Sequence, residues 1–324
     1  MNIRRILNAI ACFILLPSLL HGLEYVTRHG VAAGTFINIT VEKKEGSSLI
    51  LDEAFTRIKV MERLFSVYDR NSEISILNRK GKHEVSDEMI RVLEKSVSIS
   101  VITKGAFDVT CKPLIDLYRK AEKRDVEPSE QEISGALKNV GWKKIRINGN
   151  MVRLQKGMEI DLGAIAKGYI VDRTAEFLKG KGIKNALIDA GGDIYAYGIN
   201  PHGRKWQIGI RNPFRKNSFI KRIGISDRGV ATSGDYERFY TIKKKKYGHI
   251  VNPSTGKSVQ DYPAGVTVIA PDCTTADALA TAFFVMGPGP AVRLADKMNG
   301  IGVLIIDRGG KTYMNSGFSN LCLP

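Results

Sequence analysis

Two residues in the C-terminal part of the chain have the types and spacing of a divalent-cation site. Asp277 and Thr281 are four positions apart at the start of a predicted helix, in the segment PDCTTADALAT. At this spacing, a carboxylate and a hydroxyl lie on one helix face. Both are hard oxygen ligands suited to Mg²⁺, which usually completes its shell with phosphate and water. Taken alone, however, the segment is better explained as an ordinary first helical turn, capped by Thr274 or Thr275.

A second segment, IDLGAIAKGYIVD, has the composition of an anion-binding turn. Asp161 is predicted at a strand end, and the small residues Gly163 to Gly168 are predicted to form a turn before a helix. Exposed N–H groups at such a turn attract anionic oxygen, and small side chains allow a phosphate to approach. Lys167 could neutralise phosphate charge. A plain strand-turn-helix remains the favoured interpretation of this segment alone, because neither GxGxxG nor GxxxxGK[ST] is present.

A histidine follows in GHIVNPSTG, a β-like run that ends in turn residues. The ordinary pKa of histidine, about 6.5, suits proton transfer near neutral pH, so His249 is a candidate acid–base group. A lone histidine is nevertheless more often structural than catalytic.

Aromatic and acidic residues in the N-terminal half complete the set of candidates. Tyr68, in SVYDRNSEISILN, offers a stacking surface for a flat ring. Asp108 follows Phe107 in KGAFDVTCKPL, which places a polar group beside an aromatic face. Each of these signals is weak, because a loop packed over a hydrophobic core would look similar.

The elements that must position these residues are a mixture of helices and strands. Hydrophobic periodicity and capping residues predict helices at 49–65, 86–104, 129–141, 165–178 and 275–286. Strands are predicted at 35–41, 145–154, 186–197, 266–270 and 303–306, with several short β-like runs between 206 and 251. The segment 66–78 is predicted to be a loop. Helices grouped early and strands grouped late favour an α+β fold over a doubly wound parallel sheet.

The composition is that of a globular protein with a strong positive charge. Hydrophobic residues make up 43% and charged residues 25% of the 324 residues, which excludes a disordered protein. The net charge of +16 indicates attraction to anions such as nucleotides, acidic proteins or lipid headgroups, or simply a basic solvated surface. No nucleic-acid-binding motif accompanies the charge, so nucleic acid is not expected as a partner.

The first 22 residues have the pattern of an export signal. Arg4 and Arg5 precede the apolar run Ile6 to Leu20, which is short for a membrane span. We therefore expect a signal peptide or N-terminal membrane anchor at 1–22, followed by one compact unit of one or two lobes at 23–324. Beyond residue 22, the cysteines are Cys111, Cys273 and Cys322; they are far apart and indicate neither a disulfide framework nor a zinc site.

Taken in order, eight segments resemble the ApbE family of FAD:protein FMN transferases. They are Gly34-Thr35, SVYDRNSEISILN, GAFDVT, IDLGAIAKGYIVD, DAGGD, ATSGDYER, GHIVNPSTG and DALAT. The resemblance implies an α+β fold related to the tunnelling fold, export, and the binding of FAD and Mg²⁺. It also implies an enzyme that attaches FMN through a phosphoester to a threonine of a target protein and releases AMP.

The resemblance also implies roles for individual residues. The metal would be held by the Ala164 carbonyl, Asp277 and Thr281. The FAD contacts would be Tyr68, Ala106, Phe107, Asp108, Asp161, Lys167 and the His249-Ile250 pair. Ala33 stands where methionine is common in the family, so its contact with the flavin or adenine is in doubt. His249, as general base, and Asp277 are the expected catalytic residues.

Three other functions are compatible with the same residues. An FAD pyrophosphatase would use water in place of threonine, and a flavin-binding protein would hold FAD without turnover. A basic membrane-surface adaptor would depend on net charge alone. The expected partner is a threonine-bearing protein of a membrane redox system, met in the periplasm or at the outer face of the inner membrane.

Overall fold

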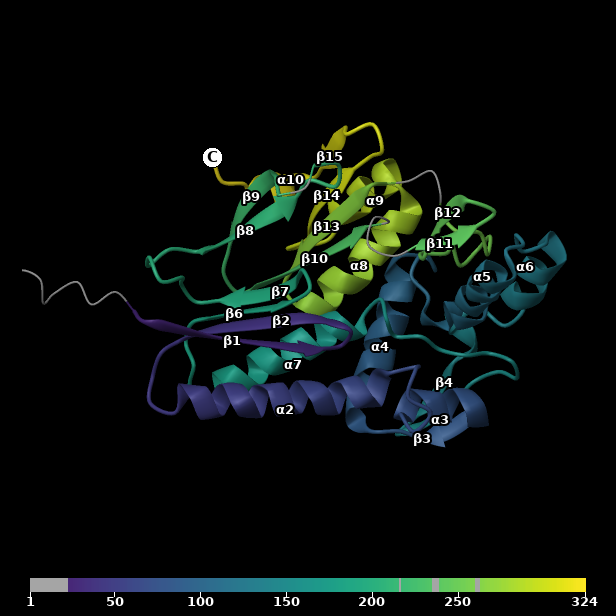
Figure 1. The fold of residues 1–324 in the computed structure, drawn as a ribbon, viewed down its shortest axis with the longest axis horizontal. Helices are drawn as coiled ribbons and strands as arrows, with labels where there is room; N and C mark the ends of the chain where they lie inside the picture. The colour runs from purple at the N-terminus through teal and green to yellow at the C-terminus, as the bar shows by residue number, and fades with distance from the viewer. Residues whose placement is uncertain (1–22, 216, 235–238, 260–262) are drawn as a thin grey trace, which may run out of the picture.

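An antiparallel sheet forms the centre of the molecule (Figure 1). The computed structural model describes residues 23–215, 217–234, 239–259 and 263–324, so the predicted signal or anchor at 1–22 lies outside the described residues. Within these ranges, eight strands join in the order β1-β2-β6-β7-β10-β13-β14-β15, and each pairs antiparallel with its neighbours. Their bounds are β1 (Tyr25–Ala32), β2 (Thr35–Glu42), β6 (Ala186–Ala190), β7 (Asp193–Tyr197), β10 (Arg228–Gly234), β13 (Gly265–Ala270), β14 (Gly302–Ile306) and β15 (Thr312–Met314). The antiparallel sheet and its helices confirm the predicted α+β class.

Helices cover one face of the sheet, and a small second sheet covers part of the other. The helical layer consists of α2 (Ser47–Phe65), α7 (Ala166–Gly180), α8 (Cys273–Met286) and α9 (Pro288–Ala295). Eleven of the 14 residues of α8 are buried, because α8 packs on β10, β13 and α7 at once. On the opposite face, β8 (Trp206–Arg211), β9 (Phe219–Ile225) and α10 (Ser316–Ser319) enclose a separate apolar cluster. We call this whole assembly the sheet lobe.

A second lobe extends from one end of the sheet, on the right of Figure 1. It contains α3 (Glu73–Lys80), α4 (Asp87–Ile102), η2 (Val109–Cys111), α5 (Lys112–Arg124), α6 (Glu130–Leu137), η3 (Trp142–Lys144), β3 (Lys82–Glu84), β4 (Arg146–Asn148), β5 (Met151–Arg153), β11 (Phe239–Ile242) and β12 (Lys245–Gly248). We call it the helical lobe. It has its own apolar cluster, in which Leu114 and Tyr118 of α5 pack with Ile242 and Tyr247.

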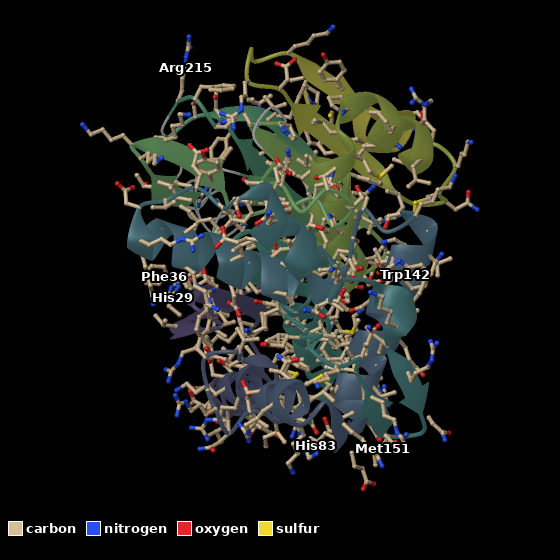
Figure 2. All side chains as sticks on the ribbon, turned by 90° about the vertical axis from the view of Figure 1, so that its right-hand side faces the viewer. His29, Phe36, His83, Trp142, Met151 and Arg215 are labelled. Atoms are coloured by element: carbon tan, nitrogen blue, oxygen red, sulfur yellow. The ribbon has the colours of Figure 1, made fainter. Side chains whose placement is uncertain are left out.

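Figure 2 views the molecule from the side of the helical lobe. His83 and Met151 lie together at its lower end, where β3 pairs with β5. Phe36, on β2, and Trp142, at the start of η3, lie on opposite sides of this view. In this view, the helices of the helical lobe lie in front of one end of the sheet.

Most predicted elements are confirmed to within a few residues. The helices at 49–65, 86–104, 165–178 and 275–286 correspond to α2, α4, α7 and α8. Ser129 and Glu132 form the predicted capping box at the start of α6. In the described part of the chain, no helix has the length and apolar composition needed to cross a bilayer.

Several expectations about the elements were wrong. The supposed loop 66–78 contains the start of α3, whose cap is Ser72: its hydroxyl accepts the Ser75 N–H. The stretches at 145–154 and 186–197 are hairpins rather than single strands, turning at Gly149 and at Gly191-Gly192. Asp161 does not follow a strand; the preceding residues are irregular, and the Asp161 N–H donates to the Val109 carbonyl.

Candidate active site

The close crossing of α7 and α8 brings Asp277 to the start of α7. Gly168 makes this crossing possible, because a Cβ there would overlap the Cys273 carbonyl oxygen and lie 2.9 Å from the Asp277 Cβ. The Gly168 N–H donates to Asp277 Oδ2 at 3.1 Å. Asp277 is 5% exposed. The Asp277 carboxylate is therefore held by backbone in a largely buried position.

A backbone oxygen just before α7 also has no partner. Gly168 is the third residue of α7, and the first N–H groups of a helix have no acceptor within it. Asp277 accepts one of them, and no hydrogen bond between described residues reaches the Ala164 carbonyl, which precedes the helix cap. An unpaired carbonyl and a carboxylate near the start of the same helix suit a metal ion.

Lys167 and Asp193 form an ion pair beside Asp277. Lys167 is in the first turn of α7, not in the turn before it as predicted, and Asp193 begins β7 with 2% of its surface exposed. Burial opposes the charge on Lys167, but Asp193 and Asp277 outweigh this effect and raise the pKa of the ammonium. Burial and the negative charge of Asp277 raise the pKa of Asp193. With both carboxylates ionised, the cluster has a net negative charge that favours a bound cation.

Thr281 lies one turn beyond Asp277 on α8. Its hydroxyl is 3.2 Å from the Ser233 hydroxyl of β10. The cap of α8 is not Thr274 or Thr275, because Asp272 accepts the Thr275 N–H. Among the described residues, no group of three or more His, Cys, Asp or Glu gathers as a metal site. A cation here would therefore depend on few protein oxygens, as Mg²⁺ does when phosphates and water complete its shell.

The N-terminus of α8 is also held by an acidic residue of α7. Asp172 accepts the N–H groups of Cys273 and Thr274, each at 2.8 Å, and the Thr274 hydroxyl. Burial nevertheless raises the pKa of Asp172 to about 6, against the lowering effect of these hydrogen bonds. Asp172 and Gly168 together fix α8, and with it Asp277, relative to α7.

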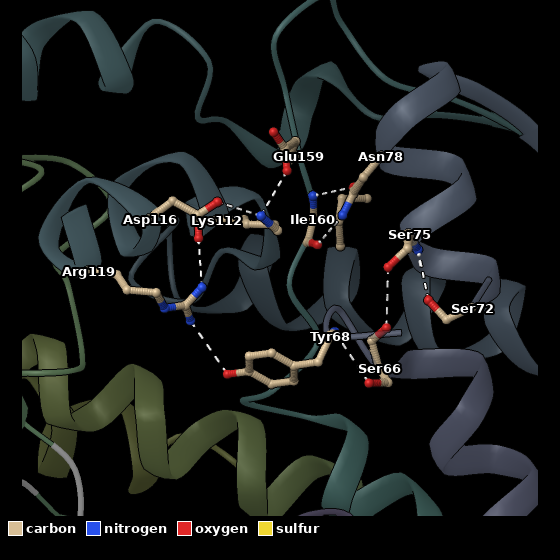
Figure 3. Close-up of polar contacts among 10 residues, drawn as sticks. All are labelled: Ser66, Tyr68, Ser72, Ser75, Asn78, Lys112, Asp116, Arg119, Glu159 and Ile160. Carbon is tan, nitrogen blue, oxygen red and sulfur yellow. Dashed lines mark hydrogen bonds and ion pairs between the residues drawn. The ribbon is translucent and has the colours of Figure 1, made fainter. Parts of the chain in front are cut away.

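Tyr68 exposes its ring on the helical lobe. The ring is 79% exposed, and its hydroxyl accepts a hydrogen bond from Arg119 at 3.4 Å (Figure 3). The Arg119 guanidinium lies 5.7 Å from the ring centroid. The ring is exposed, as a stacking face must be, and Arg119 fixes its direction.

A chain of ion pairs connects Tyr68 to two other candidate segments (Figure 3). Asp116 accepts from Arg119 at 3.0 Å and from Lys112 at 2.5 Å. Lys112 also pairs with Glu159 at 2.8 Å. The Asn78 side chain binds both the N–H and the carbonyl of Ile160, at 2.7 and 2.8 Å. These contacts fix the irregular segment that precedes Asp161.

The segment 106–108 does not offer the aromatic face that the sequence predicted. Phe107 is 2% exposed, so its ring is part of the core. The Asp108 carboxylate accepts the N–H and hydroxyl of Thr110 and the N–H of Trp142, and burial raises its pKa against these hydrogen bonds. Both Asp108 oxygens are thus engaged in holding the loop. Ala106 is half-buried, and the segment can offer mainly its backbone to a ligand.

Asp161 and the adjacent His249 and Ile250 come from two separate segments of the chain. Asp161 is half-buried and accepts the Gly163 N–H at 2.8 Å, which shapes the turn before α7. His249 follows β12 and is half-buried, whereas Ile250 packs into the main core with 8% exposure. The Ile250 side chain is therefore structural, and only its backbone could reach a ligand.

Ala33 lies in the turn between β1 and β2. Ala33 and Gly34 both have positive φ angles, 51° and 68°. Gly191, in the β6–β7 turn, packs so closely against the Thr35 hydroxyl that any side chain at Gly191 would overlap it. The two turns are thus adjacent, and the second leads directly to Asp193.

Comparison with known proteins places this arrangement in a family. A family model described as the ApbE family matches residues 33–305, which is most of the chain. The chain belongs to the ApbE family. It is 32% identical to an FAD:protein FMN transferase of Vibrio cholerae, over 97% of this chain and 98% of that protein. It is 34% identical to an FAD:protein FMN transferase of Haemophilus influenzae, over 82% and 81% of the two chains.

Solved structures of ApbE proteins have the same fold. The flavin transferase ApbE of Vibrio cholerae superposes with a TM-score of 0.82 at 30% identity, covering 92% of this chain and 99% of that one. The ApbE protein of Thermotoga maritima gives a TM-score of 0.84 at 32% identity, covering 93% and 100%.

Within the ApbE fold of this chain, sequence reasoning missed two residues. Asp193 belongs to the DAGGD segment, but only the tertiary structure brings it to Lys167. Arg119 lies in a helix for which no prediction was made, and no local pattern connects it with Tyr68. By contrast, the i, i+4 spacing of Asp277 and Thr281 was a sufficient signal for their common face. Four residues of ATSGDYER, at 235–238, lie outside the described residues.

Proposed function

We propose that this chain transfers FMN from FAD to a threonine hydroxyl of a target protein and uses Mg²⁺ to do so. The observation that supports the metal most directly is the largely buried Asp277 carboxylate, which the Gly168 N–H holds at the start of α7, where the Ala164 carbonyl accepts no hydrogen bond from a described residue. Asp277, Thr281 and that carbonyl would hold the ion. Mg²⁺ would supply positive charge to the pyrophosphate as charge develops there.

The residues of the chain have separate tasks in this reaction. The threonine oxygen forms a bond to the phosphorus next to riboflavin, and the bond from that phosphorus to the bridging oxygen breaks. AMP leaves with the electron pair. Lys167 supplies a fixed positive charge for the phosphates, and Tyr68 offers a stacking face. A ring nitrogen of His249 accepts the threonine proton, a step typically worth 10²–10⁴-fold in rate.

The experiment is an FMN-transfer assay with purified chain, FAD and Mg²⁺. Exported proteins of the source organism are added as acceptors, and AMP release and FMN-modified threonine are followed by chromatography and peptide mass spectrometry. Transfer predicts acceptor-dependent AMP release and a threonine peptide carrying FMN. Equal AMP release with and without acceptors, and free FMN, would identify a pyrophosphatase. Tight FAD binding without AMP would identify a binding protein.

We also propose that the chain works outside the cytoplasm, on a target protein of a membrane redox system. The support is the Arg4-Arg5 pair followed by the apolar run Ile6 to Leu20. N-terminal sequencing of the protein from fractionated cells should find a start near Leu23, or an intact chain in the membrane fraction. An intact chain starting at Met1 in the soluble cytosol would contradict this proposal.

A further inference from the structure

The turn between β11 and β12 places two lysines where the backbone favours other residues. Lys243 and Lys244 form a two-residue hairpin turn with φ angles of 47° and 62°. Such turns favour Asn-Gly or Asp-Gly, because both central residues need positive φ. The left-handed conformation costs a residue with a side chain roughly 1–2 kcal/mol. The backbone therefore gives no reason for lysine at either position.

The positive charge continues beyond the turn. Lys245 and Lys246 follow directly, and all four lysine side chains are exposed. Lys245 makes a long ion pair of 3.5 Å with Glu127 and remains 71% exposed, while Lys246 lies over the Phe239 ring. We call residues 239–248 the lysine hairpin. Its tip presents concentrated positive charge to solvent.

The lysine hairpin is firmly attached to α5. The Thr241 N–H donates to Glu122 at 2.7 Å, and the Lys243 N–H donates to Asp125 at 2.5 Å. The Tyr118 ring stacks on Tyr240, with 6.2 Å between centroids. A charged tip on a fixed support suits recognition of a surface, because little conformational freedom is lost on binding.

The base of the lysine hairpin borders the candidate active site. Tyr240 interacts electrostatically with Arg119 and Tyr68, the pair that forms the exposed stacking face. The chain leaves β12 and continues into His249. Five residues of extended chain from Lys244 to His249 span at most about 17 Å. The tip can therefore touch the outside of a large molecule whose reacting group reaches His249.

The position of the lysine hairpin favours a protein over a lipid surface as its partner. It lies on the right-hand side of the molecule in Figure 1, whereas β1, near the start of the described chain, begins on the left. If an N-terminal anchor holds the chain at a membrane, the hairpin is on the end away from that attachment.

We propose that the lysine hairpin binds an acidic surface of the protein that receives FMN. This inference rests on the proposed transfer function and adds the charge of the partner. Exposed charges at the rim of an interface increase the association rate and make it sensitive to salt.

The test replaces the turn with one that the backbone prefers. The double variant Lys243→Asn, Lys244→Gly removes two charges while keeping the hairpin, so its melting temperature should equal or exceed that of the native chain. The matched control, Lys205→Asn with Lys221→Asn, removes two exposed charges near β8 and β9 of the sheet lobe. The substrate is the threonine-bearing acceptor recovered in the transfer assay, and fluorescein-labelled polyglutamate is the binding probe.

We expect the turn variant to raise the KM for the acceptor about three- to tenfold, since exposed ion pairs are individually weak. Its kcat and its KM for FAD should stay within about twofold, and its KM for the acceptor should depend less on NaCl. Polyglutamate should bind the turn variant more weakly than the control variant.

Four results would overturn the inference. They are an unchanged KM for the acceptor, an equal loss in the control variant, a raised KM for FAD, and an effect limited to phosphatidylglycerol vesicles. The raised KM for FAD would mean that the lysine hairpin attracts the nucleotide, and the vesicle result would mean that it binds lipid. Failure of the native chain to transfer FMN to any acceptor would instead refute the proposed function, and this inference with it.

Discussion

The Gly168 N–H and the Asp277 carboxylate are joined by a 3.1 Å hydrogen bond between two crossing helices. This bond is possible only because residue 168 has no side chain. It fixes the direction of the carboxylate at the start of α7. One glycine thus positions the only carboxylate of the candidate metal site.

Asp277→Asn should reduce FMN transfer at least about 100-fold at ordinary Mg²⁺ concentrations, because it removes the only carboxylate among the proposed ligands. The fold should persist, since the amide oxygen can still accept from Gly168. Transfer is measured against Mg²⁺ concentration, and near-UV circular dichroism monitors the fold. Asp272→Asn, which keeps a capping side chain on the same helix, serves as control and should transfer normally. Normal transfer by Asp277→Asn would show that Asp277 is not a metal ligand.

His249→Ala should lower kcat for transfer by roughly 10²–10⁴-fold, as loss of a general base does. The affinity for FAD should change much less, because the phosphate and metal contacts remain. Flavin fluorescence gives the affinity, and transfer at saturating FAD gives the rate in the same preparation. Weaker FAD binding with nearly normal turnover would show a binding role instead.

Gly168→Ala should destabilise the fold by roughly 1–3 kcal/mol, because the added methyl group forces α7 and α8 apart. Transfer should fall as Asp277 moves with α8. The matched control is Gly180→Ala. Gly180 ends the same helix and has open space around it, so this substitution should leave the stability unchanged or raise it by up to about 1 kcal/mol. Urea unfolding measures the stability of both variants. Equal stability of the two variants would show that the crossing tolerates a side chain.

The stability of the chain should depend on pH through Asp172. Burial raises its pKa to about 6 in the folded protein, so between about pH 4 and 6 the folded state holds a proton that the unfolded state has lost. Stability therefore falls as pH rises through this window. Between these pH values, the free energy of unfolding of the native chain should fall by up to roughly 3 kcal/mol relative to that of Asp172→Asn. Urea unfolding at each pH measures this difference. A native chain that gains stability over this window would show that the hydrogen bonds to Asp172 outweigh its burial.

The sequence predicted well what depends on local periodicity. The helices that carry Lys167 and Asp277 were found because apolar spacing and small residues mark them. The strand β1 was not predicted, because its alternation is broken by Arg28, His29 and Gly30. Helix α3 was missed because its eight residues are too few for a clear period.

Contacts between distant segments could not be predicted in this way. The Lys167–Asp193 pair joins residues from α7 and β7, and the Arg119–Tyr68 contact joins residues 51 positions apart. Such contacts depend on how helices and strands pack, which no local pattern encodes. The burial of Phe107 is of the same kind: the motif marks its position, but packing decides that its ring faces the core.

The pairing of β2 with β6 has a consequence for how the chain folds. Ile37 lies opposite Ala190, and Val41 lies opposite Ala186, so nearly the whole helical lobe is inserted between two neighbouring strands. Closing such a long loop costs entropy before the pairing compensates for it, and contacts of this separation slow folding. During synthesis, the β1–β2 hairpin emerges first, and its β2 edge stays unpaired until β6 has been made. Until then, that exposed edge is open to pairing with a wrong strand.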